Sequence, residues 1–442
     1  MKNVIAIRKE TKDKTQRRVP LVPEHVRNLV KKHGVRVLVE PWEQRIFSDA
    51  EYKKAGAILT RDLSQANIVF GVKEVAPQYL LPDMAYCFFS HVIKGQTYNM
   101  GMLKDMLNKK TSLLDYELVK DHQGKRLIFF GEYAGLAGTI DTMWALGKRL
   151  LHEGIKNPFS HIKYATNYLR LYEARDAFLE ASYQIAEKGL PRQLTPLVVG
   201  ITGTGHVTKG AISLFDMLPT VTLNPEELES FFKKGKFSNK VVYEVLFQKQ
   251  HLYKRKKGSE PFNLKHFNAN PSEYTSGLER YLPYLTVLIN GIYWDSRFPK
   301  LVTKKFTRDL FAGRKKPRLR VIGDITCDIE GSIEINLEET NMNNPVYVYD
   351  VRDGKIHYGV DGKGPVVLAV DKLPNELAYE ASTSFGTALL PFVPMLARAD
   401  FKTKSGLPAL PPEFIDALIV QNGKLSKNFS YLNQHIKHAL KK

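Results

Sequence analysis

Strand-like and helical segments alternate from the first residues of this chain, and this feature constrains the fold most. Residues 3–10 are strand-like, residues 23–33 have helical periodicity, and residues 36–41 are strand-like again. Pro23 stands in the first turn of the predicted helix and Gly34 follows its end, as is typical of helix boundaries. Such a rhythm favours parallel strands connected by helices. We therefore expect an α/β fold with doubly wound, mainly parallel sheets.

The alternation of strand-like and helical segments continues to about residue 133. Ser48 and Gly56 are suited to begin and end a short helix. Further helical and apolar segments follow at residues 66–73, 84–91, 97–109, 111–117 and 126–133. Several strand-like segments end in polar side chains, among them Lys73 and His91. Because the carboxyl ends of parallel strands meet at one edge of a sheet, we expect Lys73 and His91 to lie at the same edge.

Composition excludes several classes of protein. The chain has 442 residues, 43% of them hydrophobic, which suggests two or three domains. Two cysteines do not support a disulfide framework or a thiolate metal site, and we predict no bound metal. Neither a long apolar stretch nor a signal-like start is present, so we expect no membrane association. The formal charge of +19 is compatible with nucleic acid, an anionic surface or anionic substrates.

A second unit begins after the helical residues 133–154. Residues 196–215 read as a strand, a Gly-rich turn and a helix, an arrangement whose backbone amides suit a pyrophosphate. The turn has Gly203 and Gly205, but Thr208 stands where a third glycine is usual, and Gly210 follows. The pattern alone leaves open a dinucleotide site or a turn without a ligand. The next strand, residues 220–224, ends without Asp or Glu, and the basic stretch KKGKFSNK follows, so we expect NADPH to be preferred over NADH.

Residues 225–283 are interpreted as a basic, aromatic insertion. Lys254 to Lys257 could contact phosphates of a nucleic acid, but the other basic residues are scattered, which favours a solvated loop. We therefore predict no nucleic-acid partner. Short strands are expected at residues 318–334, 346–351, 355–360 and 365–374, before an apolar helix at 384–399.

Ten segments carry a resemblance to a known family. They occur in the same order as in that family and are RRVPLVPEHV, GVKEV, FFSHVIKGQ, MGMLKDML, LLDYELV, FGEYAGLAG, GITGTGHVTKGA, PYLTVLINGIYW, GDITCDIEGSIE and LPNELAYEAS. Over nearly its whole length the chain resembles the lysine-ketoglutarate reductase domain of aminoadipic semialdehyde synthase, in the alanine dehydrogenase/saccharopine dehydrogenase family. The resemblance implies two Rossmann-like domains with the active site in a cleft.

The same resemblance implies domain limits and a reaction. A discontinuous catalytic domain would comprise residues 1–138 and 385–442, and a dinucleotide-binding domain residues 139–384. The enzyme would join lysine to 2-oxoglutarate and reduce the imine with NADPH to form saccharopine. A glutamate-forming saccharopine dehydrogenase, as a domain or a protein, would be a partner. The compartment would be the cytoplasm, or the mitochondrial matrix for a domain of the bifunctional enzyme.

Site residues follow from the family motifs. Lys73 and His91 match the acid and base, with the lysine pKa lowered by burial or positive charge. Glu74 and Glu117 match acidic positions that tune this pair, and Arg18 and Arg126 match positions suited to substrate carboxylates. The expected dinucleotide site comprises Gly203, Thr204, Gly205, His206, Val207, Asn290, Gly291, Ile292 and Asp324.

Other interpretations are open at this point. Arg17, next to Arg18, could be the carboxylate ligand instead. The chain could also be an NAD-linked amino-acid dehydrogenase of the same family, or a dinucleotide-binding regulatory module without activity.

Overall fold

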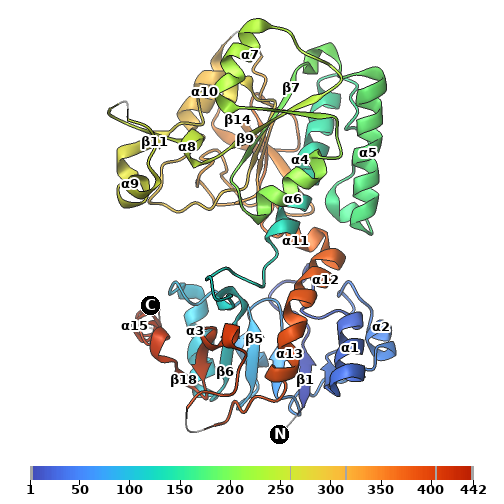
Figure 1. Cartoon of the computed structure of the whole chain (residues 1–442), viewed down its shortest axis with the longest axis vertical. Helices are drawn as coiled ribbons and strands as arrows, with labels where there is room; N and C mark the ends of the chain where they lie inside the picture. Colours follow the sequence, from blue (N-terminus) through green and yellow to red (C-terminus); the bar gives the residue numbers. More distant parts are fainter. Residues whose placement is uncertain (1–2, 259, 314–315, 404–405, 440–442) are drawn as a thin grey trace. The chain divides into compact units, whose positions relative to one another are not determined.

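The structure, a computed structural model, describes residues 3–258, 260–313, 316–403 and 406–439. The chain forms two compact units (Figure 1). Unit 1 comprises residues 1–130 and 378–442, and unit 2 comprises residues 131–377. The limits expected from the sequence, after residues 138 and 384, fall inside helices α4 (Gly131–His152) and α12 (Ala378–Leu389).

Unit 1 is built on one sheet with helices on both faces. Its further elements are β1 (Val4–Ile7), α1 (Pro23–His33), β2 (Arg36–Val39), α2 (Asp49–Lys54), β3 (Ile58–Leu59), β4 (Ile68–Phe70), β5 (Ala85–Phe88), α3 (Thr97–Asn108), β6 (Ser112–Asp115), α13 (Val393–Leu396), α14 (Pro412–Ile415), β17 (Leu418–Gln421), β18 (Lys424–Leu425) and α15 (Leu432–Ala439). The strand order is β18-β17-β6-β5-β4-β1-β2-β3. The strands from β6 to β3 are parallel, and the C-terminal strands β17 and β18 add antiparallel ladders.

Alternating side chains bury both faces of this sheet. In β1, Ile5 and Ile7 face a core that includes residues of α1, α2, α12 and α13, whereas Ala6 faces a core that includes residues of α3 and α15. The helix boundaries follow the expected local chemistry. α1 has Pro23 at its start and Gly34 at its end with a φ of 59°, and the Ser48 hydroxyl accepts a hydrogen bond from the Glu51 N–H at the start of α2. The predicted α/β fold class is confirmed.

Unit 2 has a second sheet of eight strands. Its further elements are α5 (Leu171–Lys188), β7 (Leu197–Thr202), α6 (His206–Phe215), β8 (Thr220–Leu223), α7 (Leu228–Lys234), β9 (Val242–Phe247), α8 (Lys249–Leu252), β10 (Tyr253–Arg255), α9 (Leu264–Ala269), β11 (Tyr274–Ser276), β12 (Val287–Asn290), α10 (Lys304–Ala312), β13 (Val321–Asp324), β14 (Val346–Asp350), β15 (Lys355–Tyr358), β16 (Val366–Leu368) and α11 (Leu373–Glu376). The strand order is β15-β14-β16-β13-β12-β7-β9-β8, in which β14 is antiparallel to both of its neighbours, β15 and β16.

The position of β9 corrects the expectation for residues 225–283. These residues are not one insertion, because β9 lies within them and pairs with β7 on one side and β8 on the other. Five of its six residues are buried, as expected for a central strand with cores on both faces. The excursion from the sheet is confined to α8, α9 and the small β10–β11 sheet (Figure 1).

Residues 126–133 also differ from the expected strand. Arg126 makes only an isolated bridge to Lys120, and α4 begins at Gly131. The ring of Phe130 instead stacks on that of Phe385, with 4.5 Å between the centroids, so aromatic packing takes the place of strand pairing. No helix among the described residues has the length and apolar character needed to cross a bilayer.

Candidate active site

Backbone hydrogen bonds bring the segments after β4 and β5 side by side in unit 1. The two strands are parallel, and the ladder continues beyond them through the Phe89 N–H, which donates to the Val72 carbonyl at 3.1 Å. Lys73 directly follows Val72, and His91 comes two residues after Phe89. The parallel pairing expected from the sequence is therefore present, and both segments lie at the carboxyl edge of the sheet.

His91 is joined to Glu74 at this edge. Its Nδ1 lies 2.8 Å from Oε1 of Glu74, which also accepts hydrogen bonds from the Asn99 amide at 3.1 Å and the Lys12 ammonium at 3.3 Å. Burial raises the pKa of Glu74, but the hydrogen bonds from His91 and Asn99 outweigh it and the pKa falls to about 2. Glu74 is thus a carboxylate, and Nδ1 of His91 donates to it. The other ring nitrogen, Nε2, is the one suited to exchange a proton with a substrate.

Three buried polar residues that are not among the predicted site residues hold these segments in place. Glu10 accepts hydrogen bonds from the N–H groups of Val72 at 2.7 Å and Lys73 at 3.0 Å. Asp115 accepts from the Ser90 N–H at 3.0 Å, and Asn99 donates to the Ser90 carbonyl at 2.9 Å. His91, next to Ser90, has a φ of 48°, which is uncommon for a residue other than glycine. Glu10 and Asp115 stand just after a strand and at a strand end, which is the sequence signal that could have found them.

Burial raises the pKa of both supporting carboxyl groups, Glu10 and Asp115. Burial raises the pKa of Glu10, although Arg8 and the bonds from Val72 and Lys73 oppose the change. Burial likewise raises the pKa of Asp115, against the hydrogen bonds from Ser90. Both groups accept backbone N–H donors, so each ties down the segment that follows a neighbouring strand.

Arg18 is buried beside the same edge. It is 4% exposed, its Nε donates to Oε1 of Gln16 at 2.9 Å, and its guanidinium lies 4.4 Å from the centroid of the Phe130 ring. Its charge is near enough to Glu10 to lower the pKa of that carboxyl group. A guanidinium presented on an aromatic ring is pre-organised to bind a carboxylate through two parallel hydrogen bonds.

Glu117 and Arg126 form an ion pair with each other. An Arg126 nitrogen lies 3.8 Å from Oε1 of Glu117, and both side chains are about a third exposed. The Arg126 guanidinium lies 6.0 Å from the centroid of the Phe89 ring, two residues before His91. Their roles toward a substrate stay a prediction.

The Gly-rich turn of unit 2 has the geometry that a pyrophosphate requires. It connects the buried strand β7 to α6, whose N-terminus is capped by Gly205 without any side-chain hydrogen bond. Gly203 has a φ of 97°, and a Cβ there would press on the carbonyl oxygen of Gly291. A Cβ at Gly205 would meet no atom within 4 Å, so the space in front of the helix amides is open. The residues present therefore fit a dinucleotide.

Gly210 explains why Thr208 can occupy the third position of the motif. A Cβ at Gly210 would collide with the Glu132 carbonyl of α4, and one at Gly135 of α4 would collide with the Val207 carbonyl of α6. The close helix packing that a third glycine usually permits is thus achieved one half-turn later. Thr208 is buried and donates through its hydroxyl to the Thr202 carbonyl at 3.2 Å, which ties α6 to β7.

Asn290 and Asp324 end two strands next to the turn and are part of a buried polar network. Asn290 accepts from the Thr202 hydroxyl at 2.8 Å and donates to Asp324 at 2.9 Å, and the other Asp324 oxygen accepts from Asn336 at 2.9 Å. Burial raises the pKa of Asp324 to about 6. Both oxygens of Asp324 have partners within the protein, so the network fixes the shape of this edge. Direct contact of Asn290, Gly291, Ile292 and Asp324 with a dinucleotide stays a prediction, as it does for Thr204, His206 and Val207.

The reasons given for NADPH from the sequence are wrong in their geometry. Residues 233–240 precede β9 and so lie at its amino end, away from the turn, and Lys240 there donates to the Ala186 carbonyl at 2.8 Å. Asn224 ends β8, which is separated from β7 by β9. The strand that adjoins the turn is β9, since the Gly203 N–H donates to the Phe247 carbonyl at 3.1 Å.

A buried pair of carboxyl groups lies elsewhere in unit 2, between α4 and α11. Asp141 is fully buried and Glu376 is 3% exposed, and the hydroxyl of Tyr164 donates to Glu376. Oδ1 of Asp141 accepts from the Ala165 N–H at 2.7 Å. Burial raises the pKa of both carboxyl groups, that of Glu376 to about 7, and for Asp141 the neighbouring Glu376 adds to the rise. The folded protein therefore holds a proton at this pair more strongly than separate, solvated carboxyl groups would.

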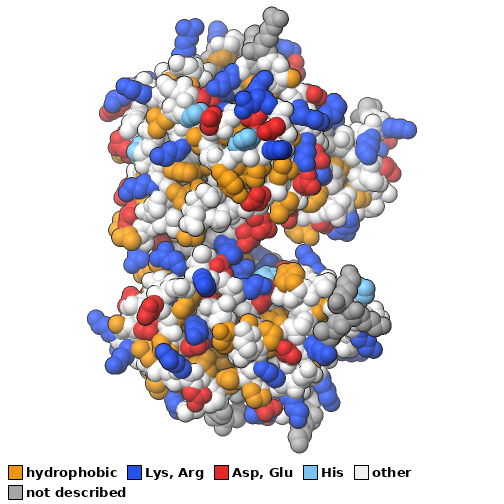
Figure 2. Space-filling view, turned by 180° about the vertical axis from the view of Figure 1, so that it is seen from behind, with side chains coloured by type: hydrophobic (Ala, Val, Ile, Leu, Met, Phe, Trp, Pro, Cys, Tyr) orange, Lys and Arg blue, Asp and Glu red, His pale blue; other side chains and the backbone are white. Residues whose placement is uncertain are grey.

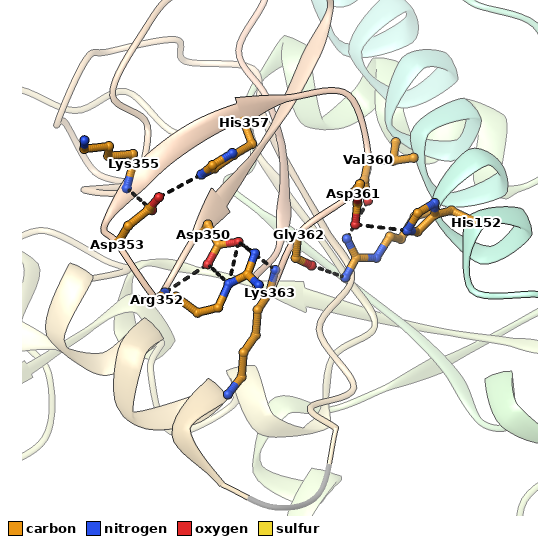
Figure 3. Close-up of polar contacts among 11 residues, drawn as sticks. His152, Asp350, Arg352, Asp353, Lys355, His357, Val360, Asp361, Gly362 and Lys363 are labelled. Carbon is orange, nitrogen blue, oxygen red and sulfur yellow. Dashed lines mark hydrogen bonds and ion pairs between the residues drawn. The ribbon is translucent and has the colours of Figure 1, made fainter.

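A cavity of about 700 Å³ lies at the amino edge of the unit 2 sheet. Its lining combines the end of α4 with the segments before β13 and β16 and the turn after β14 (Figure 3). Arg149 donates to the Gly362 carbonyl at 3.0 Å, His152 contacts Asp361 at 3.1 Å, and Arg352 pairs with Asp350. These charges bind one another and the loop at 360–363, which indicates a structural role, and the cavity is at the edge opposite the Gly-rich turn.

Together, the sheets and the turn define a Rossmann-like α/β protein. One unit carries His91, Glu74 and Lys73 at the carboxyl edge of its sheet, and the other carries a Gly-rich turn suited to a dinucleotide. Residues 6–137 match the family model for the alanine dehydrogenase/PNT N-terminal domain. L-alanine dehydrogenase of known structure shares the fold, with a TM-score of 0.61, 19% sequence identity and 99% of each chain covered.

These matches and the relatives below confirm the resemblance to the alanine dehydrogenase/saccharopine dehydrogenase family that the motifs predict. The chain is 36% identical to mitochondrial alpha-aminoadipic semialdehyde synthase of Bos taurus, over 98% of this chain and 48% of the relative. A second relative, from Emericella nidulans, is named saccharopine dehydrogenase (NAD(+), L-lysine-forming). It is 25% identical over 88% of this chain and 91% of the relative. The chain thus spans about half the length of the synthases that it matches.

Proposed function

We propose that the chain is a nicotinamide-dinucleotide oxidoreductase that condenses L-lysine with 2-oxoglutarate and reduces the product to saccharopine. The lysine ε-amine would attack the keto carbon, water would leave, and the resulting C=N bond would be reduced. The bound dinucleotide supplies the hydride for this reduction. The names of the relatives support this substrate class, and the junction of His91 with Glu74 at the edge that carries Lys73 is the observation on which the proposal rests.

The edge of unit 1 offers groups for each proton transfer. Nε2 of His91 takes a proton from the incoming amine and returns one to the departing oxygen, while Glu74 stabilises the imidazolium that forms. Lys73, held through its N–H by Glu10, is the second acid or base. Arg18 binds a carboxylate of the keto acid, since its guanidinium is buried and stacked on Phe130.

The proposal extends to cofactor and context. NADPH is the preferred donor, and the product is consumed by a glutamate-forming saccharopine dehydrogenase, as a further domain or a separate protein. The greater length of the synthase relatives supports a further domain as the consumer of the product. The mammalian relative's name supports the mitochondrial matrix over the cytoplasm. Basic side chains are interspersed with acidic ones on the face shown in Figure 2, which favours small anionic substrates over nucleic acid.

The test is a spectroscopic assay of the whole chain with lysine, 2-oxoglutarate and NADPH or NADH. Oxidation of the cofactor that requires both substrates is expected, and His91→Gln should reduce kcat at least about 100-fold, as for loss of a general acid/base. Lys120→Ala, an exposed position in unit 1, is the matched control and should retain activity. Dinucleotide binding without turnover would instead indicate a regulatory module, and turnover with alanine in place of lysine would reject the substrate assignment.

A further inference from the structure

The exposed end of β9 stands where the adenosine ribose of a dinucleotide is recognised in folds of this kind. In such folds the residue after the strand that adjoins the Gly-rich turn contacts the ribose, through a carboxylate for a 2′-hydroxyl or an arginine for a 2′-phosphate. Here that strand is β9, because its last residue, Phe247, accepts the hydrogen bond from Gly203. Gln248, Lys249 and Gln250 follow and are exposed, and none of them is acidic.

Arg280 reaches the same place through a chain of ring contacts. The ring of Tyr281 lies 5.1 Å from that of Phe247 between centroids, and the Arg280 guanidinium lies 4.5 Å from the centroid of Tyr281. The positive charge of Arg280 also acts on His251, which shows that the guanidinium is near the end of β9. Arg280 is exposed, and its only hydrogen bond among those described goes to the neutral hydroxyl of Tyr281, so its charge is available to an anion.

We propose that Lys249 and Arg280 form the subsite for the adenosine 2′-phosphate of NADP(H). This inference rests on the proposed binding of a dinucleotide at the Gly-rich turn. A guanidinium fork held on an aromatic ring suits a phosphate, and the lysine adds a second positive charge. Asn224, the residue first considered, follows β8 and stands two strand spacings from β7, about 10 Å. The residues proposed to recognise the ribose therefore follow β9, the third strand of this sheet in sequence, and not β8, the second.

Glu226 is the acidic side chain beside this subsite, and His251 restrains it. The Nδ1 of His251 accepts the Gln248 N–H at 3.0 Å, so Nε2 carries the proton and donates to Glu226 at 3.0 Å. Burial lowers the pKa of His251, although Glu226 opposes this, and the imidazole is neutral. The carboxylate of Glu226 weakens the attraction for a phosphate without cancelling the two cations.

The experiment measures binding of 2′,5′-ADP and 5′-AMP to the full chain by calorimetry, so that no turnover is needed. The wild type should bind 2′,5′-ADP at least about tenfold more tightly, as expected for added charge-assisted hydrogen bonds. Arg280→Ala and Lys249→Ala should each weaken 2′,5′-ADP by about tenfold and 5′-AMP by less than about twofold. Arg280→Lys should recover part of the loss. Lys236→Ala, in the basic stretch at the opposite edge, is the matched control and should change neither ligand.

Glu226→Gln gives a change of opposite sign. Removal of its charge should tighten 2′,5′-ADP by about two- to fivefold. If Glu226 instead accepts a ribose hydroxyl, the same variant will weaken 5′-AMP, and the inference is overturned. Equal affinity of the wild type for both nucleotides overturns it as well, while leaving the dinucleotide site intact. Binding of neither nucleotide would reject the proposed dinucleotide site itself, which distinguishes the two failures.

Discussion

Glu376→Gln should make the protein more stable at pH 8 and leave its stability at pH 5 nearly unchanged. Glu376 and Asp141 are buried side by side, and burial raises the pKa of Glu376 from 4.5 to about 7. A raised carboxyl pKa means that the folded state holds the proton more tightly than the unfolded state. The contribution to stability is complete below about pH 4.5 and is lost as the pH rises through 7.

The magnitude follows from the size of the shift. A rise from 4.5 to about 7 corresponds to about 3 kcal/mol of unfolding free energy at most, at 1.36 kcal/mol per pKa unit. Glutamine cannot ionise, its carbonyl accepts the Tyr164 hydroxyl, and its amide can donate to Asp141. The variant should therefore keep about 1 to 3 kcal/mol that the wild type loses above pH 7.

Thermal melts at pH 5 and pH 8 provide the assay. At pH 8 the variant should melt about 2 to 8 °C above the wild type, and at pH 5 within about 1 °C of it. Glu187→Gln, an exposed position at the end of α5, is the matched control and should show no pH-dependent difference. A variant that is destabilised equally at both pH values would refute the proton held at this pair, because it would mean that the fold requires the Glu376 carboxylate.

Three further predictions concern the two candidate sites. Arg18→Ala should raise the KM for 2-oxoglutarate at least about tenfold and change dinucleotide affinity little, with Arg18→Lys recovering part of the loss; weakened binding of all ligands together with a lowered melting temperature would indicate a structural role instead. Glu74→Gln should destabilise the protein by about 1 to 3 kcal/mol at pH 6, and the difference should fade as the pH falls toward 2. The reason is that a carboxyl group with a lowered pKa contributes stability above its unfolded value of 4.5. Urea titrations at pH 3 and pH 6 test this, and an equal loss of stability at both pH values would contradict it. Gly210→Ala should destabilise unit 2 by at least about 2 kcal/mol through its collision with Glu132, whereas Gly101→Ala, in open space within α3, should stabilise by about 0.5 to 1 kcal/mol; chemical unfolding of both variants tests this, and similar values would refute the close packing of α4 and α6.

The sequence predicts strands well where a short apolar run ends in a polar residue or glycine. The strands that lead to Lys73 and His91 are of this kind, and their parallel pairing follows from the rhythm of the chain. The run at 126–133 has a similar composition but is not a strand, because Phe130 packs into a ring cluster with Phe385, a partner distant in the sequence. Strand propensity cannot distinguish these outcomes, since tertiary packing decides between them.

The strand β9 was missed for a related reason. Its residues, VYEVLF, are as apolar as those of β7, but they lie within a basic and aromatic region that favours a loop. The sheet order, with β9 between β7 and β8, depends on long-range pairing that no local pattern encodes. Asn99 was missed at the candidate site because its hydrogen bonds go to Glu74 and Ser90, outside its own helix. A polar residue that holds a neighbouring loop looks like any other polar residue until the fold is known.

Because β9 lies between β7 and β8 in the sheet, the strands of a nascent chain must pair in a fixed order. β8 is synthesised before β9, yet in the described parts of the chain it pairs with β9 alone. β8 must therefore wait as an unpaired segment until β9 has docked on β7. Pulsed amide exchange during refolding should find β8 protected no sooner than β9. A chain interrupted before Val242 would leave the fully buried strand β7 with an open edge, where a strand of another molecule could add.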